Sequence, residues 1–207
     1  RMVGAFWHGL ILAFALILPI GMQNGFLLSQ GALHRRWLAA LPAVVTAALC
    51  DTFLVALAVF GVSGAVFHIV WLRVALGIVG VAFLLYMGFQ TWRENPDHDA
   101  VTSEVWSPRR QMGFAMSVSL LNPHALMDTL AVIGGSAAVY GTWGERASFA
   151  AACALVSWVW FFFLMTLGHV AGRAAAGVGL KRVINRISAL MMWASAGLLI
   201  HILLTFR

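Results

Sequence analysis

Charged residues are scarce in this sequence: they make up only 10% of its 207 residues, whereas hydrophobic residues make up 62%. A soluble globular domain carries about a quarter charged residues, so this composition, with a mean hydropathy of +0.91, excludes an ordinary soluble domain. The excess of 13 Lys and Arg over 7 Asp and Glu does not indicate a nucleic-acid partner, because the basic residues fall in short segments between apolar runs. We therefore expect an all-α polytopic membrane protein in a lipid bilayer.

Cysteine is also scarce, and the pattern of the two cysteines excludes two further classes of site. Cys50 and Cys153 lie inside apolar runs without the spacing of a disulfide or metal-ligand set, so we interpret them as packing residues and expect no cofactor. The first apolar run, residues 9–33, is too long for the core of a signal peptide and lacks a small-residue cleavage pattern. We interpret it as a spanning helix, and we expect the natural start at Met2, which follows Arg1.

The apolar runs predict six membrane-spanning helices arranged as two halves. The expected helices cover residues 4–31, 37–61, 66–91, 111–139, 147–168 and 184–205. A polar linker, residues 93–110, separates a first three-helix repeat, residues 1–92, from a second, residues 111–207. Because three helices per repeat is an odd number, the second repeat must enter the membrane from the opposite side. The prediction is therefore a pair of inverted repeats.

Lysine and arginine are distributed unevenly between the two sides of this arrangement. Nine of the 13 follow the first, third or fifth helix, and four lie on the other side. The nine are Arg35, Arg36, Arg93, Arg109, Arg110, Arg173, Lys181, Arg182 and Arg186. Since positive residues concentrate in cytoplasmic loops, we expect a cytoplasmic linker and two external termini.

Two of the expected helices contain a helix breaker near the centre. Pro19 interrupts the first helix, and Pro123 interrupts the fourth, 104 residues later. Proline in a helix interior removes a backbone hydrogen bond and kinks or breaks the helix. Two interrupted helices at matching places in two halves point to a transporter binding site at bilayer mid-depth.

Polar residues surround these two breaks. We expect backbone amides freed at the breaks, from Gly21 through Gln23 to Asn24 and at Asn122, to bind a substrate carboxylate, and the two amide side chains to face the substrate. The alternative for Gln23 and Asn24 is a structural role, in which they cap a restarted half-helix or form hydrogen bonds between helices.

Asp51 and Asp128 are the only carboxylates expected inside helices, and no Lys or Arg lies at comparable depth. A charge at the centre of a membrane helix costs about 2.5–3.5 kcal/mol, so such residues are normally functional. Two acids without a basic partner predict a cationic ligand; the alternative is that each carboxyl is protonated and hydrogen bonded to a neighbour. His124, four residues before Asp128, would share its helix face and relay protons, or would only pack against a backbone carbonyl.

Two segments carry a resemblance to a known family. They are Ile17-Leu18-Pro19-Ile20-Gly21-Met22-Gln23-Asn24-Gly25-Phe26, followed by Gln30-Gly31, and Leu121-Asn122-Pro123-His124, followed by Asp128-Thr129. In these motifs, and along nearly the whole chain, the sequence resembles the LysE-type basic amino-acid exporters, and among them the arginine exporter branch. That family usually has Pro between the Gly and the Gln of the first motif, where this chain has Met22, so we expect Pro19 to supply the break. The resemblance implies efflux of L-arginine, and of L-lysine or canavanine, across a bacterial inner membrane.

Expulsion of a cation against an inside-negative potential costs about 2.3 kcal/mol per 100 mV, so we expect exchange for a proton carried by Asp128 and His124. Two other functions stay open. Divalent metal efflux would use Asp51, His124 and Asp128 as a sparse set of ligands. An intramembrane enzyme is the less favoured interpretation, because no nucleophile has a spaced base. The sequence leaves open whether the chain forms a homo-oligomer.

Overall fold

The computed structural model describes residues 1–18, 22–62, 69–93, 105–121, 126–171 and 178–205, and these residues contain no strand. The expectation of an all-α chain is confirmed in this described part. Its elements are α1 (Met2–Ile17), α2 (Met22–Leu33), the 3₁₀-helix η1 (Trp37–Ala40), α3 (Leu41–Ala56), the π-helix η2 (Leu57–Val62), α5 (Val70–Arg93), α6 (Pro108–Leu120), the π-helix η4 (Met127–Ile133), α8 (Gly134–Ala137), α9 (Trp143–Ala171) and α10 (Val178–Thr205).

The first and fourth expected helices are each divided in the structure. Helix α1 ends at Ile17 and α2 begins at Met22, while α6 ends at Leu120 and η4 begins at Met127. The predicted breakers themselves, Pro19, Gly21 and Pro123, lie outside the described residues.

Several helices are longer than the sequence predicts. Helix α6 begins at Pro108, because Ser107 caps it by accepting a hydrogen bond from the backbone N–H of Arg110 at 3.4 Å, and proline suits the first helical turn. Helix α10 begins at Val178, six residues before the expected start, and α9 extends the expected helix at both ends. Charged residues near helix ends had hidden these extensions from a reading of hydropathy alone.

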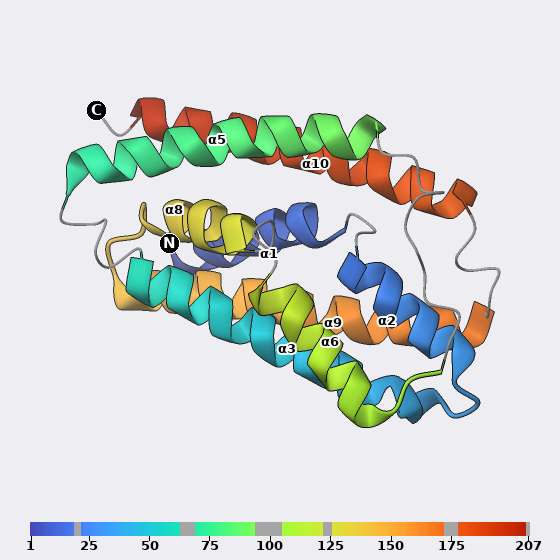
Figure 1. The fold of residues 1–207 in the computed structure, drawn as a ribbon. Helices are drawn as coiled ribbons and strands as arrows, with labels where there is room; N and C mark the ends of the chain where they lie inside the picture. The colour runs from blue at the N-terminus through green and yellow to red at the C-terminus, as the bar shows by residue number, and fades with distance from the viewer. Residues whose placement is uncertain (19–21, 63–68, 94–104, 122–125, 172–177, 206–207) are drawn as a thin grey trace.

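Two helical stretches are long and apolar enough to cross a membrane, judged by length and composition within the described residues. They are Trp37–Gly61, which joins η1, α3 and η2, and Trp143–Ala171, which is α9. Met2–Ile17 and Gly77–Gln90 are shorter apolar helices. Both chain termini lie at the same end of the molecule (Figure 1).

Helices α5 and α10 lie side by side and cover one face of the remaining helices (Figure 1). Helix α9 runs through the centre of the rest and contacts α1, α2 and α3. On the covered face, α1 contacts α10, while η4 and α8 contact α5. The divided first helix thus packs against α9 along both of its parts.

Glycine lets α2 approach α9 closely. A Cβ atom at Gly31 would overlap the backbone carbonyl of Met165, and one at Gly168 would overlap the carbonyl of Leu28. Small residues at a helix crossing permit this backbone contact in membranes. The backbone of α2, the second part of the divided helix, therefore packs directly against the backbone of α9.

The buried apolar residues form two clusters, which we call the first core and the second core. The first core joins α1, the end of α3, η2, η4 and the beginning of α9; among its members are Leu12, Val55, Val59, Val132, Phe149 and Val156. The second core joins α2, the beginning of α3, α6 and the end of α9; among its members are Phe26, Leu27, Ala47, Ala115, Trp160 and Leu164. Since α3 and α9 contribute to both cores, each passes from one core to the other near its middle.

Candidate functional site

A set of polar side chains lies on α3 and α9 between the two cores, and on α2 and α6 at the ends of these helices next to the breaks. It consists of Gln23 and Asn24 on α2, Asp51 and Thr52 on α3, Ser119 on α6 and Ser157 on α9. On α3 the last member of the second core is Ala48 and the next member of the first core is Val55, with Asp51 between them. We call this set the polar layer.

The two interrupted helices meet in the polar layer. Gln23, in the first turn of α2, donates a hydrogen bond from Nε2 to Oγ of Ser119, in the last turn of α6, at 3.0 Å. Helix α1 also contacts η4, and α2 contacts α6. The breaks, 104 residues apart by their prolines, are therefore brought together in space, as the sequence motifs predict for a binding site.

Asn24 stabilises the first break. Its side chain is buried, and its Nδ2 donates to the backbone carbonyl of Ile17, the last residue of α1. A carbonyl at the end of a helix lacks its intrahelical donor, and the Asn24 amide supplies one. The structural role left open for Asn24 by the sequence thus accounts for this contact.

Gln23 has one polar atom to offer a ligand. Its Oε1 is buried and finds no hydrogen-bond partner among the described residues, although its Nε2 is bonded to Ser119. A buried acceptor without a partner favours a donor from a bound molecule, because an unsatisfied buried polar group costs free energy.

Asp51 is half-buried at the centre of α3 and points to α9. Its Oδ2 accepts a hydrogen bond from Oγ of Ser157 at 2.9 Å. One residue along each helix, Nε1 of Trp158 donates to Oγ1 of Thr52, also at 2.9 Å. These adjacent bonds set the register of α3 on α9 and hold the carboxylate in the polar layer.

Asp128 belongs to η4, whose backbone packs against α3, the helix of Asp51. Single π-helical turns occur frequently at functional sites in α-helical proteins. Asn122 and His124, the other predicted residues of this segment, lie outside the described residues, as do Pro19, Gly21 and Pro123. Their roles stay predictions.

Sequence reasoning missed the hydroxyl residues of the polar layer. Ser119 and Ser157 partner Gln23 and Asp51. The available signal was their position inside apolar helices, because serine side chains commonly form hydrogen bonds between membrane helices. Sequence reasoning also missed the contacts of Trp106, which lies in the expected linker yet is only 7% exposed in the second core.

No group of three or more His, Cys, Asp and Glu side chains that could hold a metal ion occurs among the described residues. The polar layer there instead consists of one carboxylate, amides and hydroxyls.

The chain matches the family model described as LysE type translocator over residues 14–202. This chain belongs to the LysE type translocator family. The resemblance seen in its motifs is thereby confirmed. No solved structure matches the chain.

Curated relatives of this LysE family member have names that describe transporters. It is 44% identical to the "Putative amino-acid transporter YisU" of Bacillus subtilis (strain 168), over 94% of this chain and 88% of the relative. It is 32% identical to the arginine exporter protein ArgO of Enterobacter sp. (strain 638), over 93% of this chain and 91% of the relative. The arginine exporter protein ArgO of Salmonella schwarzengrund (strain CVM19633) is 31% identical, over 94% of this chain and 92% of the relative. The chain is thus a membrane protein of an amino-acid transporter family.

Proposed function

We propose that this protein exports cationic L-amino acids, L-arginine first and L-lysine or canavanine next, across the bacterial inner membrane in exchange for protons. The observation that carries the proposal is the Gln23–Ser119 hydrogen bond, which joins the ends of two interrupted helices beside the carboxylate-bearing helix α3. A site of this kind, at the junction of two broken helices, is the arrangement that transporters use at mid-membrane. The ArgO relatives, named arginine exporters, support the choice of substrate.

The cationic end of the substrate is assigned to the acidic side of the polar layer. Asp51 supplies a carboxylate held by Ser157, and Oε1 of Gln23 supplies a buried acceptor. Asp128, on the helix packed against α3, is the second carboxylate of this proposal. A guanidinium group has five donors in a fixed plane and satisfies several such acceptors at once.

The α-carboxylate of the substrate is assigned to the breaks. Helix α2 begins at Met22, so the amides of its first turn lack intrahelical acceptors and carry partial positive charge. In this proposal those amides, from Gly21 to Asn24, and the amides near Asn122 bind the carboxylate. The two ends of an amino acid are thus recognised by opposite features of the same layer.

The helix contacts support two inverted repeats of three helices. Exchange of the first repeat with the second turns the contacts of α1 and α2 with α9 into those of α6 and η4 with α3. The same exchange returns the α3–α9 and α5–α10 contacts to themselves. A pseudo-two-fold axis in the membrane plane relates halves in this way.

Proton antiport follows from the energetics of the exported charge. Export of one positive charge against the membrane potential costs about 2.3 kcal/mol per 100 mV, and exchange for one proton removes this cost. Burial in an empty site favours the protonated form of a carboxyl, whereas a cation bound next to it favours the ionised form. Asp128, with His124 as relay, therefore carries the proton inward and releases it when substrate binds.

The test uses purified protein in liposomes loaded with radiolabelled arginine and an internal pH indicator. Arginine efflux should acidify the interior and accelerate when the outside is made acidic, and His124→Gln should weaken this response if the histidine relays protons. Arginine efflux without proton movement would leave export but remove antiport. Efflux of a divalent metal ion from loaded liposomes, without efflux of arginine, would replace the proposal with metal transport.

A further inference from the structure

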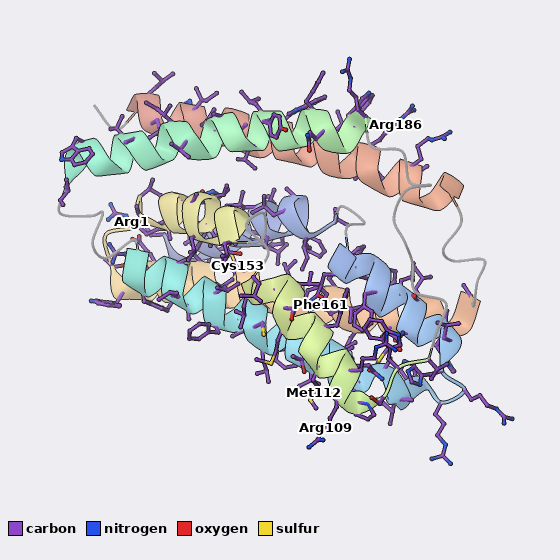
Figure 2. All side chains as sticks on the ribbon, in the orientation of Figure 1. Arg1, Arg109, Met112, Cys153, Phe161 and Arg186 are labelled. Carbon is purple, nitrogen blue, oxygen red and sulfur yellow. The ribbon has the colours of Figure 1, made fainter. Side chains whose placement is uncertain are left out.

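Helices α2 and α6 both extend from the breaks to the end of the molecule that carries the predicted cytoplasmic loops. Arg109, in the first turn of α6, lies at this end, and Arg1, before the start of α1, lies at the opposite end of the molecule (Figure 2). Gln23 on α2 and Ser119 on α6 mark the inner limit of this region. The side chains between the two helices therefore decide whether a solute can reach the polar layer from that end.

Three aromatic rings pack against one another where α2 and α6 face each other. Phe26 lies one turn beyond Gln23, and its ring is 4.5 Å from that of Phe114 on α6, measured between centroids. Trp106 completes the cluster, with its ring centroid 5.1 Å from both phenylalanine rings. On the exposed side, the guanidinium carbon of Arg110 lies 4.0 Å from the Trp106 ring centroid. We call these three rings the aromatic plug.

Trp106 differs from its partners because it belongs to no helix. Residues 105–107 form a non-helical strap before α6, in which Val105 and Ser107 are exposed and Trp106 is buried. The strap enters the second core through a single side chain, which makes it the element of the plug that can leave without moving a helix.

Two buried glutamines hold the backbone of the strap. The N–H of Trp106 donates to Oε1 of Gln30 on α2 at 3.2 Å, and its carbonyl accepts from Nε2 of Gln111 on α6 at 2.9 Å. Both glutamines are fully buried, and Nε2 of His34 lies within 3.2 Å of both side chains. Burial lowers the pKa of His34, so the imidazole stays neutral at pH 7 and adds no charge here. These amide contacts form a clamp that joins α2, the strap and α6.

The plug has one unsatisfied group. Nε1 of Trp106 is buried and has no hydrogen-bond partner among the described residues. A buried donor without an acceptor disfavours the state that buries it, and this donor reaches water only when Trp106 leaves. The hydrogen bonds of the clamp stabilise the buried position of Trp106, which we call the closed state. The unsatisfied indole N–H destabilises that position, so the two effects oppose each other.

We propose that Trp106 is the gate between the polar layer and the cytoplasmic end of the protein. In the closed state the aromatic plug separates the Gln23–Ser119 pair from that end, and the strap must release from Gln30 and Gln111 for substrate to enter. The outer face of the Trp106 ring, which binds the Arg110 guanidinium here, is the face that an entering guanidinium would meet. The gate rests on the proposed function, because it serves a site that is loaded from one side.

The experiment measures access to Ser119 without any substrate. Ser119→Cys is introduced into a chain in which Cys50 and Cys153 are replaced by Ser and Ala, and a membrane-impermeant thiol reagent is added to one side of vesicles of known orientation. Trp106→Ala should raise the rate of labelling at least tenfold from the cytoplasmic side and leave it unchanged from the other. Trp37→Ala is the matched control, because Trp37 is an exposed tryptophan bonded to Thr166 outside the plug.

Gln111→Met gives a second variant, because it keeps the side-chain volume but removes the bonds of the clamp to the strap and to the carbonyl of Ala39. It should raise labelling from the cytoplasmic side at least fivefold. The gate is rejected if neither variant changes the rate, or if Trp37→Ala or labelling from the external side changes equally. Arginine transport does not enter this measurement, so loss of the gate and loss of the exporter function are separate outcomes.

Discussion

Neutralisation of Asp51 should strongly weaken substrate binding with little loss of stability. In Asp51→Asn the side chain keeps an oxygen that can accept the hydrogen bond from Ser157, which is 2.9 Å long with Asp51. The variant lacks the charge that a bound cation would face. Two unit charges about 4 Å apart attract by about 4 kcal/mol at the effective dielectric constant of partly buried sites. Since 1.4 kcal/mol is a factor of ten, binding of arginine should weaken by up to about 1,000-fold.

Ser157→Ala should have the opposite effect: it should lower stability but keep most arginine export. The variant keeps the carboxylate but removes the hydrogen bond that Ser157 donates to it, and a hydrogen bond to a charged group contributes about 1.5–3 kcal/mol. For a chain of this size that loss lowers the midpoint of thermal unfolding by about 3–12 °C. Arginine export should fall less than tenfold. The pair therefore separates the charge of Asp51 from the packing of α3 on α9.

The assays are arginine efflux from proteoliposomes at equal protein content and thermal unfolding of the purified protein in detergent. Thr52→Ala is the matched control, because it removes the neighbouring bond from Trp158 and leaves the carboxylate intact. It should export within about threefold of wild type, since a neutral hydrogen bond contributes about 1 kcal/mol to stability. A wild-type export rate in Asp51→Asn would refute the assignment of the cation to this carboxylate.

Three further predictions test the other parts of the proposed site. Asp128→Asn should fold and insert yet lose most arginine export in the same efflux assay; an unchanged rate would remove Asp128 from the mechanism. Agmatine, which lacks the α-carboxylate, should compete with arginine about 10–100-fold more weakly, because it forgoes hydrogen bonds of about 1.5–3 kcal/mol to a charged group; equal competition would exclude recognition by the freed amides. Asp97→Cys, in the predicted cytoplasmic linker, should resist an impermeant thiol reagent in intact cells, and rapid labelling would reverse the assigned orientation.

The sequence predicted the helical class and the place of the interruptions well, for a physical reason. Long apolar runs have few alternatives to helices in a bilayer, where every backbone polar group needs a partner within the chain. The boundaries at Ile17 and Met22, and at Leu120 and Met127, flank the proline motifs as expected. The sequence also singled out Gln23, Asn24 and Asp51, and the structure places all three in the polar layer.

The partners of those residues could not be predicted, because they depend on which helices pack together. Ser157 is 106 residues from Asp51, and nothing local to either residue indicates their contact. Trp106 was hidden for a different reason: most of the residues around it are polar, so hydropathy assigns the segment to a loop. Its burial follows from Gln30 and Gln111, which satisfy both backbone groups of an irregular segment inside the core.

The correspondence of the two breaks supports a chemical division of labour between the halves. Asn24 follows Pro19 by five residues, and Asp128 follows Pro123 by five residues. Asn24 donates its amide to the carbonyl of Ile17, two residues before the proline. An amide side chain makes that bond at any pH, whereas a carboxyl at the matching position donates only while it holds a proton. In the proposed exchange, the first break therefore stays fixed through Asn24, and the second break changes its bonding when Asp128 gains or loses its proton. Under this proposal, one break would provide a constant half and the other a half that responds to protonation, which is what coupling of substrate release to proton entry requires.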